Sequence, residues 1–272
     1  MKVERYHLEG EGSEAYVDAY LSDPVKGLTR KAMLVIPGGG YGCVCSDREG
    51  EPIAQAFMPC GYNAFVLHYY TERKMPFPVQ LIQAAKAIKL IKDHAERFNI
   101  DPEQVFVIGF SAGGHLAGSA GILWKLPEIY SAVDMPHGYN KPAGILLIYP
   151  VISAEYHRIS FENLLCTKDL SRQELEKVSL ERHVDGDSAP AFILHTSNDE
   201  IVDVRNSLTL AEAYKKAGLQ FEMHIYPDAP HGVALANEVT WHGREKWKNS
   251  AIAEWVRMAA EWASSLPENK KN

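Results

Sequence analysis

The chain contains little cysteine and no long hydrophobic segment. Four cysteines occur among 272 residues, and only Cys43 and Cys45 lie close together. Without a second close pair, the spacing indicates neither a disulfide framework nor a zinc site, and we assign these thiols no function. No apolar run approaches the length of a membrane span, and the charged first residues do not resemble a secretion signal. The sequence therefore predicts a cytoplasmic protein that does not enter a membrane.

The chain also lacks an excess of positive charge. It carries 28 basic and 35 acidic residues, which gives a net charge of −7. This balance argues against nucleic acid and anionic membranes as partners and suits a neutral small-molecule substrate better than a strongly anionic one. The motif His-Glu-x-x-His is absent, and no other histidines and carboxylates form a recognisable metal-binding set, so we expect neither a metal nor another cofactor. The sequence leaves open whether the chain forms a homo-oligomer.

What the sequence does contain is an alternation of apolar strands and helical patterns. A helical pattern covers residues 79–98, and a tryptophan-rich helix is expected over 244–264. The order predicts one α/β domain spanning residues 1–272, with a mostly parallel sheet covered by helices on both faces. Runs with the composition of buried strands occur at residues 32–36, 64–69, 104–108, 144–149, 191–196 and 221–226.

The alternation stops between residues 151 and 190. This stretch is polar and contains one short helical pattern near residues 171–180. We interpret it as a small insertion that forms a lid or cap over the site. A long surface excursion is the alternative interpretation.

The most informative motif is Gly109-Phe110-Ser111-Ala112-Gly113, which lies between a predicted strand and a helix of small residues. In that context Gly-x-Ser-x-Gly forms a nucleophile elbow, a sharp turn that exposes the serine hydroxyl above the sheet. The glycines lack side chains and let the strand and the helix approach closely. Ser111 is therefore the predicted nucleophile.

A serine hydroxyl needs a base, and the base needs an acid to orient it. In this architecture the order along the chain is serine, acid, histidine. Asp199 follows the strand that ends at residue 196 and is the predicted acid, with Asp203 and Glu200 as alternatives. His231 lies after the last strand in a loop fixed by two prolines and a glycine, and it is the predicted base. His242 is the other late candidate and is expected to be a surface residue.

Acyl transfer also requires hydrogen-bond donors for the developing oxyanion. One donor is expected to be the backbone N–H of Ala112, the residue after the nucleophile. Another is expected from the glycine-rich loop at residues 37–42, which follows an earlier strand. The spacing of these glycines does not match a phosphate-binding loop.

Together these motifs resemble the α/β-hydrolase serine esterases of the group related to hormone-sensitive lipase. Within that group the chain is most similar to small bacterial acetyl esterases of the sugar- or xylan-acetyl-esterase type. Many relatives carry histidine before the three glycines, whereas this chain has Pro37. The sequence leaves open which two of Gly38, Gly39 and Gly40 donate, and we assign the loop donors to Gly38 and Gly39. The resemblance covers roughly residues 30–240 and rests on the sequences PGGGY at 37–41, GEP at 50–52, GFSAGGHLA at 109–117, HTSND at 195–199 and PHG at 230–232.

The resemblance implies a metal-independent serine carboxylesterase that hydrolyses short acyl esters, above all acetyl esters of sugars. A serine peptidase of the same fold is one alternative. A non-catalytic ligand-binding protein on a hydrolase scaffold is another, and retention of all three triad candidates argues against it.

Three tyrosines complete the predicted site. Tyr41 lies beside the glycine-rich loop, and Tyr69 and Tyr149 lie at strand ends that face the same side of the sheet. Ligands bind at that side in open α/β folds. We expect the three tyrosines to bind substrate, because a rim of hydroxyl groups on apolar rings suits a sugar that bears a small acyl group. Ordinary packing of each ring is the alternative interpretation.

Overall fold

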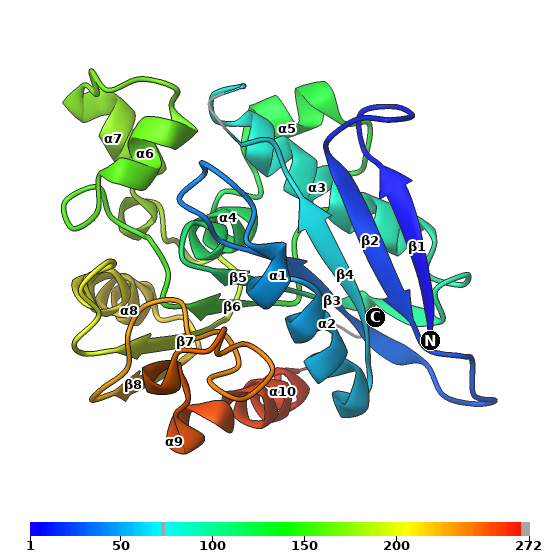
Figure 1. Ribbon diagram of the computed structural model, residues 1–272. Helices are drawn as coiled ribbons and strands as arrows, with labels where there is room; N and C mark the ends of the chain where they lie inside the picture. The colour runs from blue at the N-terminus through cyan, green and yellow to red at the C-terminus, as the bar shows by residue number, and fades with distance from the viewer. Residues whose placement is uncertain (72–73, 268–272) are drawn as a thin grey trace.

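The computed structural model describes residues 1–71 and 74–267, and its centre is one eight-stranded sheet (Figure 1). The strands are β1 (Lys2–His7), β2 (Tyr16–Leu21), β3 (Arg30–Ile36), β4 (Tyr62–His68), β5 (Ile100–Phe110), β6 (Gly144–Ile148), β7 (Ala191–Thr196) and β8 (Phe221–Tyr226). Their spatial order is β1-β2-β4-β3-β5-β6-β7-β8. All pairs among β3 to β8 are parallel. At one side of the sheet, β2 pairs antiparallel with both β4 and β1.

The central strands carry long apolar runs because both of their faces are buried there. In β5, Val105 and Val107 contribute to the core on one side of the sheet, while Phe106 and Ile108 contribute to the core on the other side. All five residues of β6 are buried. The parallel pairing of these strands and the burial of both faces confirm the predicted mostly parallel sheet.

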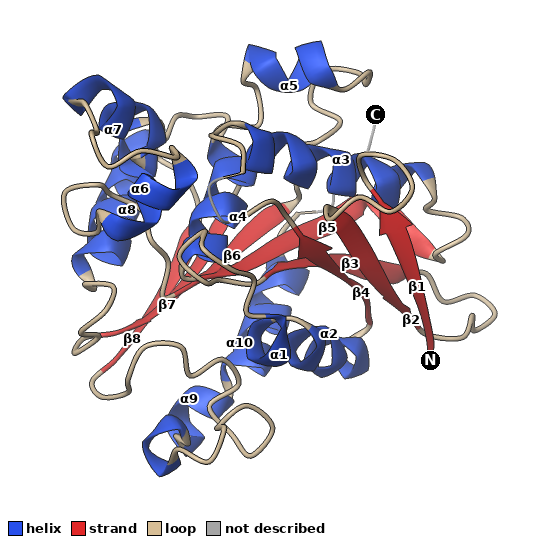
Figure 2. Cartoon of the chain, turned by 45° about the horizontal axis from the view of Figure 1, so that its top comes forward, coloured by secondary structure: helices blue, strands red, loops and turns tan. Residues whose placement is uncertain are grey.

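Helices cover both faces of the sheet, as predicted (Figure 2). The first core includes residues of α3 (Val79–Asp93), α4 (Ala112–Ile122), α5 (Pro127–Ala132) and α8 (Arg205–Ala217). On the opposite face lie α1 (Ser46–Glu49), α2 (Glu51–Phe57), α9 (Ser250–Ala253) and α10 (Trp255–Ser265). Short 3-10 turns, η1 (Met58–Cys60) and η3 (Glu245–Trp247), lie beside this second group.

The two ends of the chain differ from the sequence prediction. The charged start of the chain forms β1, an edge strand that pairs with β2, and the guanidinium of Arg5 bonds Asp18 across the pair at 2.7 and 2.9 Å. The helix expected over 244–264 is divided into η3, α9 and α10. Asn249 starts α9 by accepting hydrogen bonds from the N–H groups of Ala251 and Ile252, so the helix begins there rather than at residue 244.

The stretch from 151 to 190 contains α6 (Ile159–Leu164), α7 (Arg172–Val178) and the turn η2 (Leu180–Arg182). The expected short helix is α7, and a reciprocal capping box between Ser171 and Glu174 begins it. We call this stretch the 151–190 segment. In Figure 1 its helices α6 and α7 lie at the same end of the molecule as α8. Its assignment as a lid stays a prediction.

The described part of the chain has no helix long and apolar enough to cross a bilayer.

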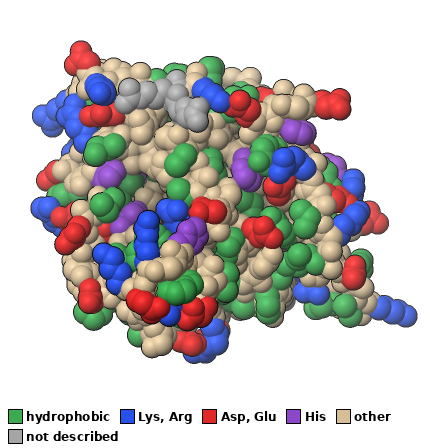
Figure 3. Space-filling view, viewed as in Figure 1, with side chains coloured by type: hydrophobic (Ala, Val, Ile, Leu, Met, Phe, Trp, Pro, Cys, Tyr) green, Lys and Arg blue, Asp and Glu red, His purple; other side chains and the backbone are tan. Residues whose placement is uncertain are grey.

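On the face drawn in Figure 3, acidic and basic side chains are interspersed over much of the surface.

Candidate active site

Ser111 lies at the tip of the sharp turn between β5 and α4. Its backbone has φ +53° and ψ −119°, a strained conformation for a residue with a side chain. A Cβ added to Gly109 would stand 2.0 Å from the Gly113 carbonyl oxygen, and one added to Gly113 would stand 2.2 Å from the Ile36 carbonyl oxygen. Only glycine fits either position, so the strand and the helix approach as closely as the motif requires.

The structure brings Ser111, Asp199 and His231 together. Ser111 Oγ lies 2.9 Å from His231 Nε2, and His231 Nδ1 lies 2.7 Å from Asp199 Oδ2. The three residues follow β5, β7 and β8, so all of them lie at the carboxyl edge of the parallel strands. Because an ionised carboxylate only accepts, Nδ1 carries the proton and Nε2 is free to accept from the serine hydroxyl.

The carboxylate of Asp199 is held in one orientation. Its Oδ1 accepts from the backbone N–H groups of Ile201 and Val202, each at 2.9 Å, and its Oδ2 also lies 3.4 Å from His195 Nε2. Burial raises the pKa of Asp199, but hydrogen bonds from His195, His231 and the backbone outweigh that effect and hold the pKa below its ordinary value. Asp199 is therefore ionised beside His231.

The alternative acids and the alternative base lie elsewhere. Asp203 accepts from the backbone N–H of Arg205 at 2.8 Å and pairs with the guanidinium of the same residue at 2.7 Å. Because Arg205 is the first residue of α8, Asp203 stabilises the start of that helix. Glu200 is exposed. His242 is 40% exposed and lies 3.6 Å from Asp47, in agreement with a surface residue.

The glycine-rich loop differs from the expectation at one position. The N–H of Gly38 donates to Glu49 Oε2 at 2.8 Å, so this donor is already occupied by a carboxylate. The assignment of Gly38 as an oxyanion donor is therefore wrong for this arrangement. Within the described residues, the N–H groups of Gly39, Gly40 and Ala112 have no hydrogen-bond partner. Gly39 has φ +125° and Gly40 has φ +62°, backbone conformations that favour glycine.

The expected rim of tyrosines is also wrong. Tyr41, Tyr69 and Tyr149 are each no more than 3% exposed, because their rings pack within the cores. The three hydroxyl groups bond inside the protein, to His115 Nδ1 at 2.8 Å, to the Pro37 carbonyl oxygen at 2.8 Å and to Glu49 Oε1 at 3.0 Å respectively. The tyrosines thus support the loops around Ser111 and do not present hydroxyl groups to a ligand.

Two polar residues near the triad had no role in the sequence prediction. Glu49 closes α1 and is 1% exposed. His157, in the 151–190 segment, lies 2.9 Å from Ser160 Oγ. Burial lowers the pKa of His157, against the opposing effect of the Asp199 charge. Neither residue belongs to a recognisable motif, so the sequence does not mark it as functional. Only the predicted lid position of the 151–190 segment could have suggested that His157 lies near the triad.

His115 joins the site to the 151–190 segment. It is fully buried, its Nδ1 accepts from Tyr41 Oη at 2.8 Å, and its Nε2–H donates to the Val178 carbonyl oxygen at 2.7 Å. Burial lowers the pKa of His115 to about 4. The imidazole is therefore neutral in the folded protein near neutral pH.

This neutral histidine should make the protein less stable in acid. The ordinary pKa of histidine in an unfolded chain is about 6.5, so between pH 6.5 and 4 the unfolded state binds a proton that folded His115 does not. Stability then falls as the pH falls through this window, by up to about 3 kcal/mol. Denaturant titrations at pH 7 and pH 4 should show a smaller loss for His115→Gln than for the wild type. The exposed His137→Gln variant should follow the wild type, and parallel losses for all three proteins would contradict the assignment.

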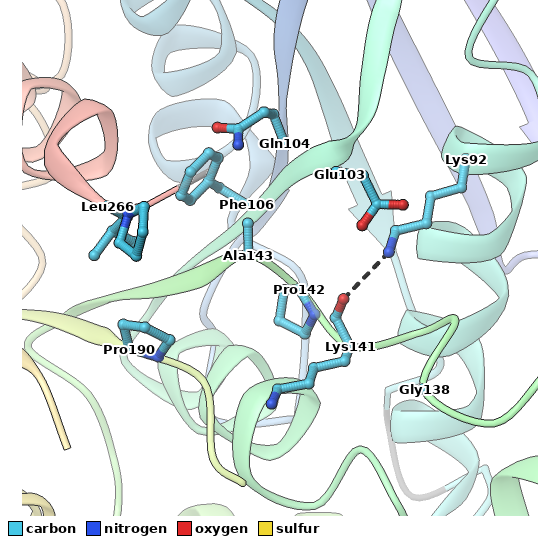
Figure 4. A pocket seen from close by; sticks show the side chains of 11 residues that line it. Lys92, Glu103, Gln104, Phe106, Gly138, Lys141, Pro142, Ala143, Pro190 and Leu266 are labelled. Atoms are coloured by element: carbon cyan, nitrogen blue, oxygen red, sulfur yellow. Dashed lines mark hydrogen bonds between the residues drawn. The ribbon is translucent and has the colours of Figure 1, made fainter. Parts of the chain in front are cut away.

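A separate hollow lies at the amino-terminal ends of the parallel strands, opposite the end that carries the triad (Figure 4). It is lined near the amino-terminal ends of three strands by Gln104, Ala143 and Pro190, and Lys92 Nζ donates to the Lys141 carbonyl oxygen at 3.3 Å. The triad residues all follow the carboxyl ends of their strands. The hollow is therefore distinct from the site around Ser111.

Comparison with known proteins identifies the family of this chain. The chain matches the BD-FAE family over residues 17–214, which is most of its length. It belongs to the BD-FAE family. Residues 177–262 also match the dienelactone hydrolase family. Among curated proteins, this BD-FAE member is 34% identical over 255 residues to endo-1,4-beta-xylanase B of Butyrivibrio fibrisolvens, a match that covers 90% of this chain and 38% of that protein. The chain thus spans about two fifths of that relative's length.

Solved structures place this BD-FAE member among the α/β-hydrolase esterases. An acetyl ester-xyloside bifunctional hydrolase from Caldicellulosiruptor lactoaceticus is 33% identical, with a TM-score of 0.79 over 92% of this chain and 88% of that one. A carboxylesterase from Lactobacillus plantarum is 28% identical, with a TM-score of 0.85 and complete coverage of both chains. The α/β-hydrolase fold and the membership of a carboxylic ester hydrolase family are as the sequence predicted.

Proposed function

We propose that this protein is a serine carboxylesterase that removes short acyl groups, above all acetyl, from the hydroxyl groups of sugars. The observation that carries the proposal is the unbroken hydrogen-bond chain from Ser111 through His231 to Asp199, at 2.9 and 2.7 Å. A serine hydroxyl is a weak nucleophile until a base takes its proton, and this chain supplies the base and orients it.

In the acylation half, Ser111 Oγ attacks the ester carbonyl carbon and its proton passes to His231 Nε2. The negative charge on the tetrahedral intermediate accepts hydrogen bonds from the N–H groups of Ala112 and Gly39, which are unoccupied in the structure. The C–O bond to the alcohol then breaks, and the alcohol leaves with the proton from His231. The acyl group remains on Ser111.

In the deacylation half, water takes the place of the alcohol. His231 Nε2 accepts a proton from the water as its oxygen attacks the acyl carbon, and the same proton returns to Ser111 Oγ as the acid is released. Asp199 stabilises the imidazolium in both halves because it is ionised and hydrogen-bonded to Nδ1.

The choice of a sugar as the alcohol has two supports. One similar protein is named a xylanase, and another is named an acetyl ester-xyloside bifunctional hydrolase. The net charge of −7 suits a neutral substrate better than an anionic one.

Short acyl groups should be the better substrates. The 151–190 segment contacts the glycine-rich loop, because Asn163 Nδ2 donates to the Gly40 carbonyl oxygen at 2.9 Å and Ser160 Oγ lies 3.8 Å from where a Gly40 Cβ would stand. A methylene that finds buried room contributes about 0.8 kcal/mol, and we expect little such room here. In a series of p-nitrophenyl esters, kcat/KM should be higher for acetyl and propionyl than for octanoyl. A rise through the octanoyl ester would contradict this.

The same assays separate the alternative functions. Acetylated xylo-oligosaccharides test the alcohol, and matched p-nitroanilides test peptidase activity. A fluorophosphonate probe should label Ser111 of an active enzyme, whereas a non-catalytic ligand-binding protein should not react. Amide hydrolysis without ester hydrolysis, or absence of labelling, would reject the proposed function.

A further inference from the structure

Glu49 is an acid buried against the candidate active site. It is 1% exposed, and both of its carboxylate oxygens accept hydrogen bonds: Oε2 from the Gly38 N–H at 2.8 Å and Oε1 from Tyr149 O–H at 3.0 Å. Burial raises the pKa of Glu49, which means that the protein holds this charge at a cost. The cation Arg48 lies close by, with its Nε 3.8 Å from Glu49 Oε1. A buried charge of this kind is stable only because hydrogen bonds and nearby charge offset its desolvation.

One partner of Glu49 belongs to the loop beside the nucleophile. A Cβ on Gly38 would stand 2.9 Å from Glu49 Oε2 and 3.0 Å from Ser111 Cβ, so the backbone of Gly38 fits between the acid and the serine. The next residue, Gly39, carries the N–H that our proposed mechanism directs at the oxyanion. The bond from Gly38 to Glu49 therefore sets how close that N–H lies to Ser111.

The other partner belongs to the histidine loop. Tyr149 Oη accepts from the Ala234 N–H at 3.1 Å while its O–H donates to Glu49. The ring of Tyr149 packs against His231, with centroids 4.9 Å apart and planes at 63°. Tyr149 also has φ +40°, a strained backbone held between these contacts. One chain of hydrogen bonds thus runs from Gly38 through Glu49 and Tyr149 to Ala234.

We propose that Glu49 is a positioning residue that ties the oxyanion loop to the histidine loop through Gly38 and Tyr149. It acts on the geometry of Ser111, His231 and the Gly39 N–H together without contacting substrate. This role rests on the proposed function, because it assigns Glu49 to the same site. A residue needed only to fill space would serve equally well without two acceptor oxygens.

The substitutions Glu49→Gln and Tyr149→Phe separate these roles. Glutamine has nearly the same shape as glutamate but offers a single acceptor, so one of the two donors loses its partner. Phenylalanine keeps the ring against His231 and removes only the hydroxyl link. Glu51→Gln is the matched control, because Glu51 is an exposed acid two residues along the chain.

We would measure kcat and KM with p-nitrophenyl acetate and the melting temperature of each variant. Replacing the residues that support the ligands of a metal site typically changes activity about 10- to 100-fold, and we expect the same range for a residue that supports a catalytic triad. We expect Glu49→Gln to lower kcat by that factor with KM within about threefold, and Glu51→Gln to leave both unchanged. The double variant Glu49→Gln/Tyr149→Phe should be no slower than the slower single variant, because both break one chain.

Each opposite result would reject the role of Glu49. The first is a kcat for Glu49→Gln within twofold of the wild type, and the second is an equal loss of kcat for Glu51→Gln. The third is an effect of Glu49→Gln on KM alone, and the fourth is a double variant whose loss of kcat equals the product of the two single losses. If Glu49→Gln does not fold, an unchanged kcat for Tyr149→Phe would reject the role and a lowered kcat would support it. Activity that survives Ser111→Ala would instead reject the proposed function.

Discussion

Replacing Ser111 with alanine should abolish ester hydrolysis while the protein stays folded. Loss of the nucleophile in a comparable triad costs roughly 10⁶ in kcat, because the base and the acid have no other hydroxyl to activate. The fold should tolerate the change, since the backbone bonds of Ser111 to Ile148 and Val151, at 3.0 Å each, do not involve its side chain. Assays with p-nitrophenyl acetate, circular dichroism and labelling by a fluorophosphonate probe test this expectation.

Ser119→Ala is the matched control. Ser119 is a buried serine in a later turn of α4, and its Oγ donates to the His115 carbonyl oxygen at 2.9 Å. Its loss should leave probe labelling intact and change kcat by no more than a few-fold. If a folded Ser111→Ala enzyme kept near-normal activity, or if the probe reacted with it as with the wild type, the nucleophile would be another residue.

The sheet and the elbow could be predicted because their physical causes are local. A strand buried on both faces must be largely apolar, and β6 has that composition over its whole length while β7 has it as far as Leu194. The elbow needs glycine at 109 and 113 because a Cβ at either position would meet a carbonyl oxygen. Chain order then limited the acid and the base to a few loop residues, and the structure brings Asp199 and His231 to Ser111.

What could not be predicted depends on contacts between distant segments. A position at a strand end indicates the edge of the sheet on which Tyr149 lies, but not that its ring packs inward and its hydroxyl bonds Glu49. The glycine run likewise does not reveal that the Gly38 N–H is occupied, because Glu49 lies eleven residues further along the chain. The edge strand β1 was missed because its exposed, charged residues lack the apolar signal of a buried strand.

Asp199→Asn should reduce kcat by roughly 10⁴, the loss that removing this charge causes in a comparable triad. The two backbone N–H groups that bond Oδ1 should keep the amide oxygen in that place, which turns the amide N–H₂ toward His231 Nδ1. His231 must then accept at Nδ1 and carry its proton on Nε2, where it cannot take the proton of Ser111. KM should change little, because Asp199 is buried and does not face the substrate.

Asp203→Asn is the control for this variant, since Asp203 follows in the same loop and was the alternative acid. An asparagine there can still accept from the Arg205 N–H, and its exposed ion pair with Arg205 contributes little, so kcat should stay within a few-fold of the wild type. Measurement of kcat for both variants with one ester decides between the two carboxylates. A larger loss for Asp203→Asn would identify Asp203 as the acid and would mean that the bond between Asp199 and His231 does not support the reaction.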